Sequence, residues 1–311
     1  MQLLSPSTSL RQPFDAAQKE EVADFWDKNG YYVLEQALSD AEVEALRAEA
    51  ARICAGEAGD IRGVMPRLDG QTDDGVLRQY LCIHFPHKIS ALMHDTLSHP
   101  AVIDVLTSVI GPDVKAMQSM LFIKAAGKPG QAWHQDEDYI PTRDRSLCGA
   151  WITLDDATIQ NGCLWIIPGS HKSGVLWDQQ WHSDKRFDCA LESIGFPYHD
   201  EDAIPVEVKA GAVVFFNGYT LHRSLPNVAT SGYRRALVNH YMSAQSFLPW
   251  SGPREGEKIG MAKLDYRDIV MVAGKDPFAH KGIENRVDPF IRSTGKGGCF
   301  DGSGEEMPYD D

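Results

Sequence analysis

The chain of 311 residues has no apolar run long enough to span a membrane, and its first residues lack the basic segment and apolar run of a secretory leader. Its Lys and Arg residues form no cluster, and 30 of them against 44 Asp and Glu give a net charge of −14. A surface of this sign is unfavourable for binding nucleic-acid phosphates. We therefore expect neither a membrane nor a nucleic-acid partner, and we expect a cytoplasmic location.

The six cysteines show neither a CxxC pair nor another spacing that is typical of zinc ligands. Several of them have apolar neighbours, so we expect reduced and mostly buried thiols. They are Cys54, Cys82, Cys148, Cys163, Cys189 and Cys299. The apolar content of 43% and the charged content of 24% are ordinary for a globular protein. The length fits one elaborated domain at least as well as two.

Residues 1–113 have mainly helical patterns. Residues 15–29 place apolar side chains on one helical face, and Gly30 follows as a stop signal. Ser39 and Glu42 have the spacing of a capping box and begin an amphipathic pattern that runs to Gly56. A further helix is expected to begin at Pro100.

From Val114 onward the pattern becomes that of short strands separated by Gly and Pro. The expected strands fall within residues 31–34, 114–124, 147–154, 162–171, 204–208, 212–216 and 235–242. Many short strands predict a mainly β protein with a jelly-roll or barrel core, and the N-terminal helices would pack outside it.

Three divisions of a single domain, residues 1–311, follow from these patterns. Residues 1–113 would form the helical N-terminal part, residues 114–243 the β core, and residues 244–311 a C-terminal extension with a candidate helix near residues 264–272. Residues 177–202 interrupt the core without a clear period, and such an insertion is a natural place for a lid or a substrate loop.

One triplet in the β region carries metal-ligand chemistry, namely His134, Gln135 and Asp136. If it lies on a strand, positions i and i+2 face the same side, so His134 and Asp136 can approach one ion. His222, on a distant strand folded alongside, would complete a 2-His-1-carboxylate set, which suits non-haem Fe(II). The alternative interpretation is a hydrogen-bonded structural cluster without metal, because short motifs often occur by chance.

The order of motifs around this triplet resembles the phytanoyl-CoA dioxygenase (PhyH) family of Fe(II)- and 2-oxoglutarate-dependent oxygenases. The resemblance covers about residues 118–241. The motifs are His134-Gln135-Asp136, Ala150-Trp151, Asn161-Gly162-Cys163-Leu164, Pro168-Gly169-Ser170-His171, His222 with Ser224 and Asn227, and Tyr233-Arg234-Arg235-Ala236. The resemblance implies a double-stranded β-helix (cupin-like jelly roll) core.

The same resemblance implies roles for individual residues. His134, Asp136 and His222 resemble the iron ligands of the family. Arg234 resembles the arginine that holds the far carboxylate of 2-oxoglutarate, a task that suits a planar and permanently charged guanidinium. Ser224 resembles the hydroxyl that assists it. The positions that line the co-substrate pocket are Trp151 and Met120, with Gln118 as a further candidate.

Several nearby side chains have less specific interpretations. His171 lies in a turn-like stretch and is expected to hydrogen-bond a loop. His240 is expected to be a hydrogen-bonded core residue, and Arg223 should point away from the metal. Asp138 and Tyr139 could line the substrate side or lie on a solvated loop.

The function implied by the resemblance is oxidation of a small-molecule substrate with 2-oxoglutarate, O₂ and Fe(II), releasing succinate and CO₂. Because the carboxylate Asp136 is present, hydroxylation or desaturation is favoured over halogenation, in which a small residue replaces this ligand. The alternatives are a passive cupin-like metal- or ligand-binding protein and a hydrolytic zinc enzyme. A monomer or homodimer is expected.

Overall fold

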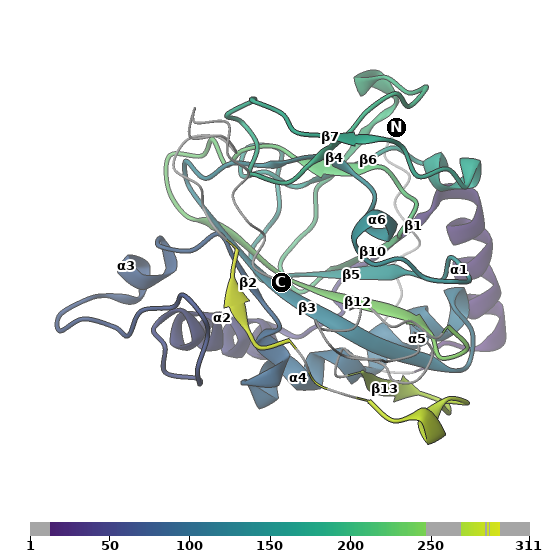
Figure 1. The fold of residues 1–311 in the computed structure, drawn as a ribbon, viewed down its shortest axis with the longest axis horizontal. Helices are drawn as coiled ribbons and strands as arrows, with labels where there is room; N and C mark the ends of the chain where they lie inside the picture. Colours follow the sequence, from purple (N-terminus) through teal and green to yellow (C-terminus); the bar gives the residue numbers. More distant parts are fainter. Residues whose placement is uncertain (1–12, 247–268, 284, 286, 293–311) are drawn as a thin grey trace, which may run out of the picture.

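A computed structural model describes residues 13–246, 269–283, 285 and 287–292 (Figure 1). Two antiparallel sheets face each other, and the helices lie mainly on the outer side of the larger sheet (Figure 1). The helices are α1 (Ala16–Asn29), α2 (Asp40–Cys54), α3 (Asp73–Leu77), α4 (Ala91–Asp95), α5 (Pro100–Val109) and α6 (Asp136–Tyr139), with 3₁₀ turns η1 (Pro86–Lys88), η2 (Thr96–Ser98), η3 (Ser170–Ser173), η4 (Asp200–Asp202) and η5 (Ala279–Lys281). The mainly β architecture with N-terminal helices outside it is confirmed.

The larger sheet has the strand order β1-β10-β5-β12-β3-β2-β14, and β13 also pairs with β3. Its strands are β1 (Tyr31–Leu34), β2 (Cys82–His84), β3 (Val114–Ala125), β5 (Cys148–Thr153), β10 (Val213–Asn217), β12 (Tyr233–Ser243), β13 (Val270–Ala273) and β14 (Phe290–Ile291). Four of these strands lie outside residues 114–243, so the sheet is wider than the segment in which the sequence predicts the core.

The smaller sheet has the order β4-β11-β6-β9, and β7 and β8 form a separate pair. These strands are β4 (Gln131–His134), β6 (Leu164–Ile166), β7 (Gln179–Gln180), β8 (Glu192–Ser193), β9 (Ile204–Val206) and β11 (His222–Ser224). In Figure 1 the smaller sheet lies above the larger one, while α2, α4 and α5 lie below it. A sandwich of this kind places strands that are distant in sequence beside one another.

The caps that the sequence predicts are present. Ser39 forms the predicted capping box at the start of α2, and Gly30 adopts the left-handed conformation (φ 77°) that ends α1. Asp15 forms a second capping box at the start of α1, which the sequence analysis did not predict. The helix α5 begins with Pro100 as expected. Residues 264–268 of the predicted C-terminal helix lie outside the described residues, and its remaining part was wrongly predicted, because Val270–Ala273 form the strand β13 on the edge of β3.

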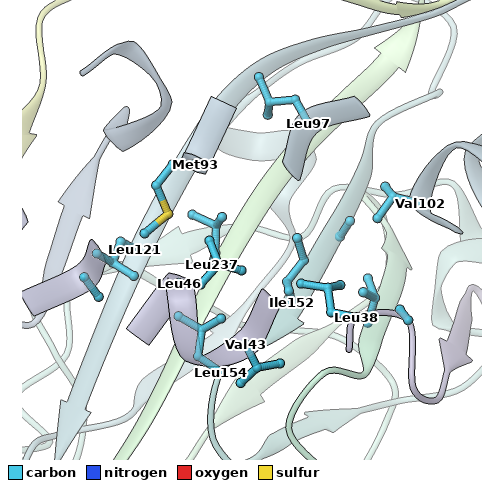
Figure 2. Close-up of a cluster of buried hydrophobic side chains, with 14 of the residues drawn as sticks. Leu38, Val43, Leu46, Met93, Leu97, Val102, Leu121, Ile152, Leu154 and Leu237 are labelled. Carbon is cyan, nitrogen blue, oxygen red and sulfur yellow. The ribbon is translucent and has the colours of Figure 1, made fainter. Parts of the chain in front are cut away.

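The main core lies between the larger sheet and the helices that cover it (Figure 2). Val43 and Leu46 of α2 pack there with Leu121 of β3, Ile152 of β5 and Leu237 of β12. Each of these side chains is at most 3% exposed. This packing fixes the outer face of the strands, so that their alternate residues project into the space between the two sheets.

The space between the sheets contains a second apolar cluster. Met120, Trp151 and Val238 from the larger sheet meet Leu164 and Ile166 from the smaller one. The described cysteines are free thiols, of which Cys54, Cys82, Cys148 and Cys163 are buried and Cys189 is partly buried, as expected. In the described parts of the chain, no helix is long and apolar enough to cross a membrane.

Candidate metal site

The two histidines predicted to bind metal meet across a strand pair. β11 runs antiparallel to β4, and His222 is the direct partner of His134 in the register. The Nδ1 atom of His134 lies 2.8 Å from the carbonyl oxygen of Ala132, and that of His222 lies 2.9 Å from the carbonyl oxygen of Thr220. A carbonyl only accepts, so each Nδ1 carries the proton and donates it. Each Nε2 therefore presents a lone pair to the space between the rings.

Asp136 lies beside these histidines, but on a different element from the one predicted. The strand β4 ends at His134, and Asp136 is the first residue of the short helix α6, so the two ligands do not share a strand face. The carboxylate nevertheless reaches the site, because Oδ1 lies 3.6 Å from Nε2 of His134 and 3.7 Å from Nε2 of His222. The predicted ligand set is thus correct, and its strand-alternation argument was wrong.

The donor set fits a divalent transition metal. One ligand atom each from His134, Asp136 and His222 lies within 4.8 Å of the others, and all three residues are buried. An ion with bonds of roughly 2.0–2.2 Å can bridge atoms at these separations. Burial lowers the pKa of His134 to about 3, with a further contribution from His222, so its imidazole is neutral as a ligand must be.

His240 contacts the site directly, which the expectation of an ordinary core residue did not include. It lies on β12, is 3% exposed, and its Nε2 is 2.9 Å from Oδ2 of Asp136. Burial tends to raise the pKa of Asp136, but the neighbouring His222, His240 and His134, of which His240 forms a hydrogen bond, together lower it below its usual range. The carboxylate is therefore ionised, with Oδ2 bound to His240 and Oδ1 facing the two ligand imidazoles.

Further inside the β sandwich, two cationic side chains project from neighbouring strands. Arg234 of β12 is the register partner of Lys124 of β3, and each is 2% exposed. The guanidinium carbon of Arg234 lies 5.2 Å from the ring centroid of Trp151, and Nε donates to the carbonyl oxygen of Gly162 at 3.0 Å. Burial lowers the pKa of Arg234 to about 10.

The alternation of β12 distinguishes Arg234 from its neighbour. Arg235 faces the other side of the sheet, where its Nη2 forms a 2.7 Å ion pair with Asp155. Arg234 is therefore the arginine that shares the inner face with Trp151.

The remaining predicted pocket residues surround the same space. Met120 and Trp151 both lie opposite Val238 of β12, and Gln118 lies opposite His240. Ser224, two residues after His222, accepts a hydrogen bond of 2.8 Å from Nζ of Lys124. The structure thus brings together all eight residues that the sequence analysis singled out.

Lys124 is a site residue that sequence reasoning missed. A signal was available, because Lys124 has the same strand parity as Gln118 and Met120 and so must share their face of β3. His240 could have been found in the same way, since it is six residues after Arg234 on β12. Parity shows only that these residues share a strand face with the predicted ones. Which groups they meet there depends on which strands are neighbours.

The less specific expectations have separate outcomes. His171 is not among the ligands, as expected, but it hydrogen-bonds the carbonyl oxygen of Asp27 in α1 and not a loop. Arg223 points outward to Asp200, as expected. Tyr139 lies beside the site, with its ring 6.3 Å from that of His134. Asp138 is partly buried, and burial raises its pKa to about 6.

The insertion and the C-terminal extension also reach this region. Asp188 of the insertion pairs with Arg292 of the extension at 2.8 Å, and its backbone N–H donates to the carbonyl oxygen of Gly130 just before β4. The side chain of Gln135, between two ligands, donates to the carbonyl oxygen of Val175 and accepts from the backbone N–H of Trp177. The start of the insertion is therefore attached directly to the metal-binding segment.

A β sandwich of this topology with two histidines and one carboxylate at its centre defines the class of non-haem iron oxygenases. The family model for phytanoyl-CoA dioxygenase (PhyH) matches residues 26–236, and the chain belongs to this family. It is thus an Fe(II)- and 2-oxoglutarate-dependent dioxygenase with the facial triad His134, Asp136 and His222. The double-stranded β-helix fold predicted from the resemblance is confirmed.

Individual relatives agree with this assignment. The chain is 30% identical over 261 residues to phytanoyl-CoA dioxygenase 1 of Oryza sativa subsp. japonica, a match that covers 75% of this chain and 91% of that protein. It is 34% identical over 187 residues to phytanoyl-CoA dioxygenase of Arabidopsis thaliana, covering 55% and 62% respectively. A solved structure of the non-heme monooxygenase ThoJ in its apo form has a similar fold, with a TM-score of 0.63, 22% identity and 89% coverage of each chain.

Proposed function

We propose that this dioxygenase hydroxylates a small organic molecule and that Arg234 anchors the co-substrate. The observation that carries this proposal is the pair of buried basic side chains, Arg234 and Lys124. Within the described residues, no carboxylate forms an ion pair with either of them. The guanidinium of Arg234 is charged, and a buried charge without a partner is costly. The far carboxylate of 2-oxoglutarate would supply the missing negative charge, since both side chains lie inside the sandwich that holds the metal site.

In this proposal the bound Fe(II) and 2-oxoglutarate supply the oxidising chemistry, in which O₂ is consumed and succinate and CO₂ are released. The chain holds and shields them. His134, Asp136 and His222 would hold the iron on one side and leave its other positions open. Arg234 and Ser224 would orient 2-oxoglutarate, and Trp151, Met120 and Gln118 would line its pocket and exclude water.

The passive cupin-like alternative is less well supported. A protein that only binds metal or sugar has no need for two buried basic side chains beside the metal site, and the charged guanidinium of Arg234 is costly to bury without an anion. A hydrolytic zinc enzyme has no need for them either.

The substrate is a small molecule, and the names of relatives and the charge of the insertion bear on its class. Two of the relatives carry the name phytanoyl-CoA dioxygenase, which makes an acyl-CoA thioester one candidate. Against it, acidic residues outnumber Lys185 and Arg186 in the insertion 177–202, so this loop is unfavourable for the phosphates of CoA. We propose that the insertion and the extension select the substrate from within a single domain, in a monomer or homodimer.

A screen of succinate release tests the proposal. Fe(II)-loaded protein is incubated with 2-oxoglutarate, O₂ and a library of acids, thioesters, amino-acid derivatives and polycyclic metabolites. We expect one class to raise succinate release well above the rate without substrate and to give a product heavier by one oxygen atom. The variant Arg234→Met should lose this release, while Lys209→Met, at an exposed lysine outside the insertion, should keep it. Equal release by the two variants would contradict the role of Arg234.

A further inference from the structure

The Nζ atom of Lys124 lies among a specific set of acceptors inside the sandwich. It is 2.8 Å from Oγ of Ser224, 2.7 Å from the carbonyl oxygen of Leu225 and 3.5 Å from that of Gly162. When Nζ is protonated it has three donors and no acceptor, so Oγ of Ser224 accepts in this contact. In that state the hydroxyl proton of Ser224 is left to donate to another group.

Gly162 makes this arrangement sterically possible and links the two cations. Its backbone has φ 84°, and a Cβ atom here would collide with the carbonyl oxygen of Leu225 and would lie 2.9 Å from Nζ of Lys124. Its carbonyl oxygen also accepts from Nε of Arg234 at 3.0 Å. The turn at residue 162 therefore holds Lys124 and Arg234 beside one another and beside Ser224.

We propose that Lys124 is a positioning residue for the co-substrate, which fixes the Ser224 hydroxyl as a donor to the far carboxylate of 2-oxoglutarate and takes up a proton when that carboxylate binds. This inference rests on the proposed function, because it requires that 2-oxoglutarate binds beside Arg234. It adds a role to a lysine that the family resemblance did not assign.

The charges around Lys124 explain the proton uptake. Burial lowers the pKa of Lys124 well below its usual value, and the positive charge of Arg234 on β12 lowers it further. Asp188 of the insertion and Cys163, just before β6, act in the opposite direction, but more weakly. A carboxylate bound to Arg234 and Ser224 would add a negative charge beside Nζ and so raise the pKa of Lys124.

The affinity for 2-oxoglutarate should depend on pH, because its binding is linked to protonation of Lys124. Binding that raises the pKa of Lys124 takes up a proton in the pH range between the pKa of the free protein and that of the complex. The affinity for 2-oxoglutarate should therefore fall as the pH rises through this range, by up to about tenfold per pH unit. A keto acid without the second carboxylate should not show this effect.

Calorimetry under anaerobic conditions tests the proposal with Mn(II)-loaded protein. The probes are 2-oxoglutarate and 2-oxobutyrate, which share the keto acid but differ in the far carboxylate. For the wild type we expect proton uptake with 2-oxoglutarate and none with 2-oxobutyrate, measured in buffers of different ionisation enthalpy. This comparison requires no variant, so it stays decisive if a substitution of Lys124 prevents folding.

Variants then assign the effect to the residue. Lys124→Met should weaken 2-oxoglutarate binding at least tenfold, abolish the proton uptake and leave 2-oxobutyrate binding within twofold. The double variant with Ser224→Ala should lose less affinity than the product of the single losses, because both changes remove the same hydroxyl donor. Lys209→Met, at an exposed lysine, is the control and should match the wild type.

Two outcomes would overturn the inference. One is wild-type protein that binds 2-oxoglutarate without proton uptake, and the other is Lys124→Met that weakens both keto acids equally, as a purely structural lysine would. If the wild type binds neither probe, the proposed function itself is wrong. The failures of the two proposals are therefore distinguishable.

Discussion

At the scale of single residues, the two carboxylate oxygens of Asp136 have different partners. Oδ2 accepts from His240, while Oδ1 faces the imidazoles of His134 and His222. Within the described residues, Nδ1 of His240 has no hydrogen-bond partner, so the bond to the carboxylate is the ring's only hydrogen bond there. One oxygen of Asp136 is thus already occupied, and this leaves one oxygen for the metal and more open positions for small ligands.

Replacing His240 should weaken metal binding. We expect His240→Phe to reduce the affinity for Co(II) by roughly 10- to 100-fold, the range found when a group that orients a metal ligand is lost. His240→Gln should recover part of the loss, because its amide can donate to the same oxygen. The measurement is a Co(II) titration followed by its visible absorption.

His94→Gln serves as the control for that titration, because His94 is exposed and lies outside the site. Unchanged affinity in His240→Phe would show that the contact with Asp136 does not position the ligand.

The metal ligands could be predicted from the sequence because they lie in short motifs that resemble those of the PhyH family. The same resemblance singled out Arg234, whose role in binding 2-oxoglutarate stays a prediction. His240 and Lys124 could not be assigned in this way. Their roles depend on the register of β12 with β3, in which His240 lies opposite Gln118 and Arg234 lies opposite Lys124. Such a register is fixed by packing between strands distant in the chain, and a single sequence does not contain it explicitly.

At the scale of elements, Arg223 of β11 connects the smaller sheet to the insertion 177–202. The guanidinium carbon of Arg223 lies 4.5 Å from the ring centroid of Trp133 and 5.9 Å from that of Trp165. Nη2 of Arg223 bonds Asp200, just before the insertion rejoins β9. Arg223 thus lies between two aromatic rings on the outer face of the smaller sheet, and it attaches the insertion through its bond to Asp200.

Loss of Arg223 should loosen the insertion without disturbing the metal. In Arg223→Ala we expect faster hydrogen exchange within residues 177–202 and a loss of roughly 0.2–1 kcal/mol in local stability, because the ion pair with the mostly exposed Asp200 is lost. Hydrogen exchange with mass spectrometry measures it.

The comparison for this experiment is Arg186→Ala, at an exposed arginine paired with Asp184 within the same insertion. If Arg223→Ala and Arg186→Ala exchange alike, the outward cation does not hold the insertion.

The element scale also explains the one wrong argument about the triad. Alternation along a strand would place His134 and Asp136 on one face, but the chain leaves β4 after His134 and turns into α6. The side chain of Gln135 stabilises this turn by bonding Val175, Trp177 and Tyr219. These partners are 40 to 84 residues away in sequence, so the turn could not be predicted from local pattern.

At the scale of the whole molecule, a buried histidine links stability to pH. His87 is 5% exposed, and its Nδ1 lies 2.6 Å from Oγ of Ser119 on β3. Burial, and to a smaller extent the charge of Lys88, lowers the pKa of His87 to about 3. In the unfolded chain a histidine has a pKa of about 6.5, so between these values the unfolded state binds more protons.

Folding stability should therefore fall as the pH drops from about 6.5 toward 3. His87 contributes a slope of up to about 1.4 kcal/mol per pH unit in this range. His87→Gln keeps a hydrogen-bonding side chain but cannot titrate. In this variant the decrease in folding stability toward acid pH should be less steep by about this amount. Urea unfolding at several pH values between 7 and 4 measures the slope.

His280→Gln, at an exposed histidine, should leave the slope unchanged. Parallel curves for the wild type and His87→Gln would show that His87 titrates normally in the folded protein.

The central claim is that His134, Asp136 and His222 hold an iron to which 2-oxoglutarate binds. Anaerobic titration of Fe(II)-loaded protein with 2-oxoglutarate, followed by visible absorption, tests it most directly. The wild type should develop a weak charge-transfer band toward the red end of the spectrum, saturating at one equivalent of iron, and Asp136→Ala should not. A metal-replete wild type that binds 2-oxoglutarate without this band, or an Asp136→Ala variant that retains it, would contradict the assignment.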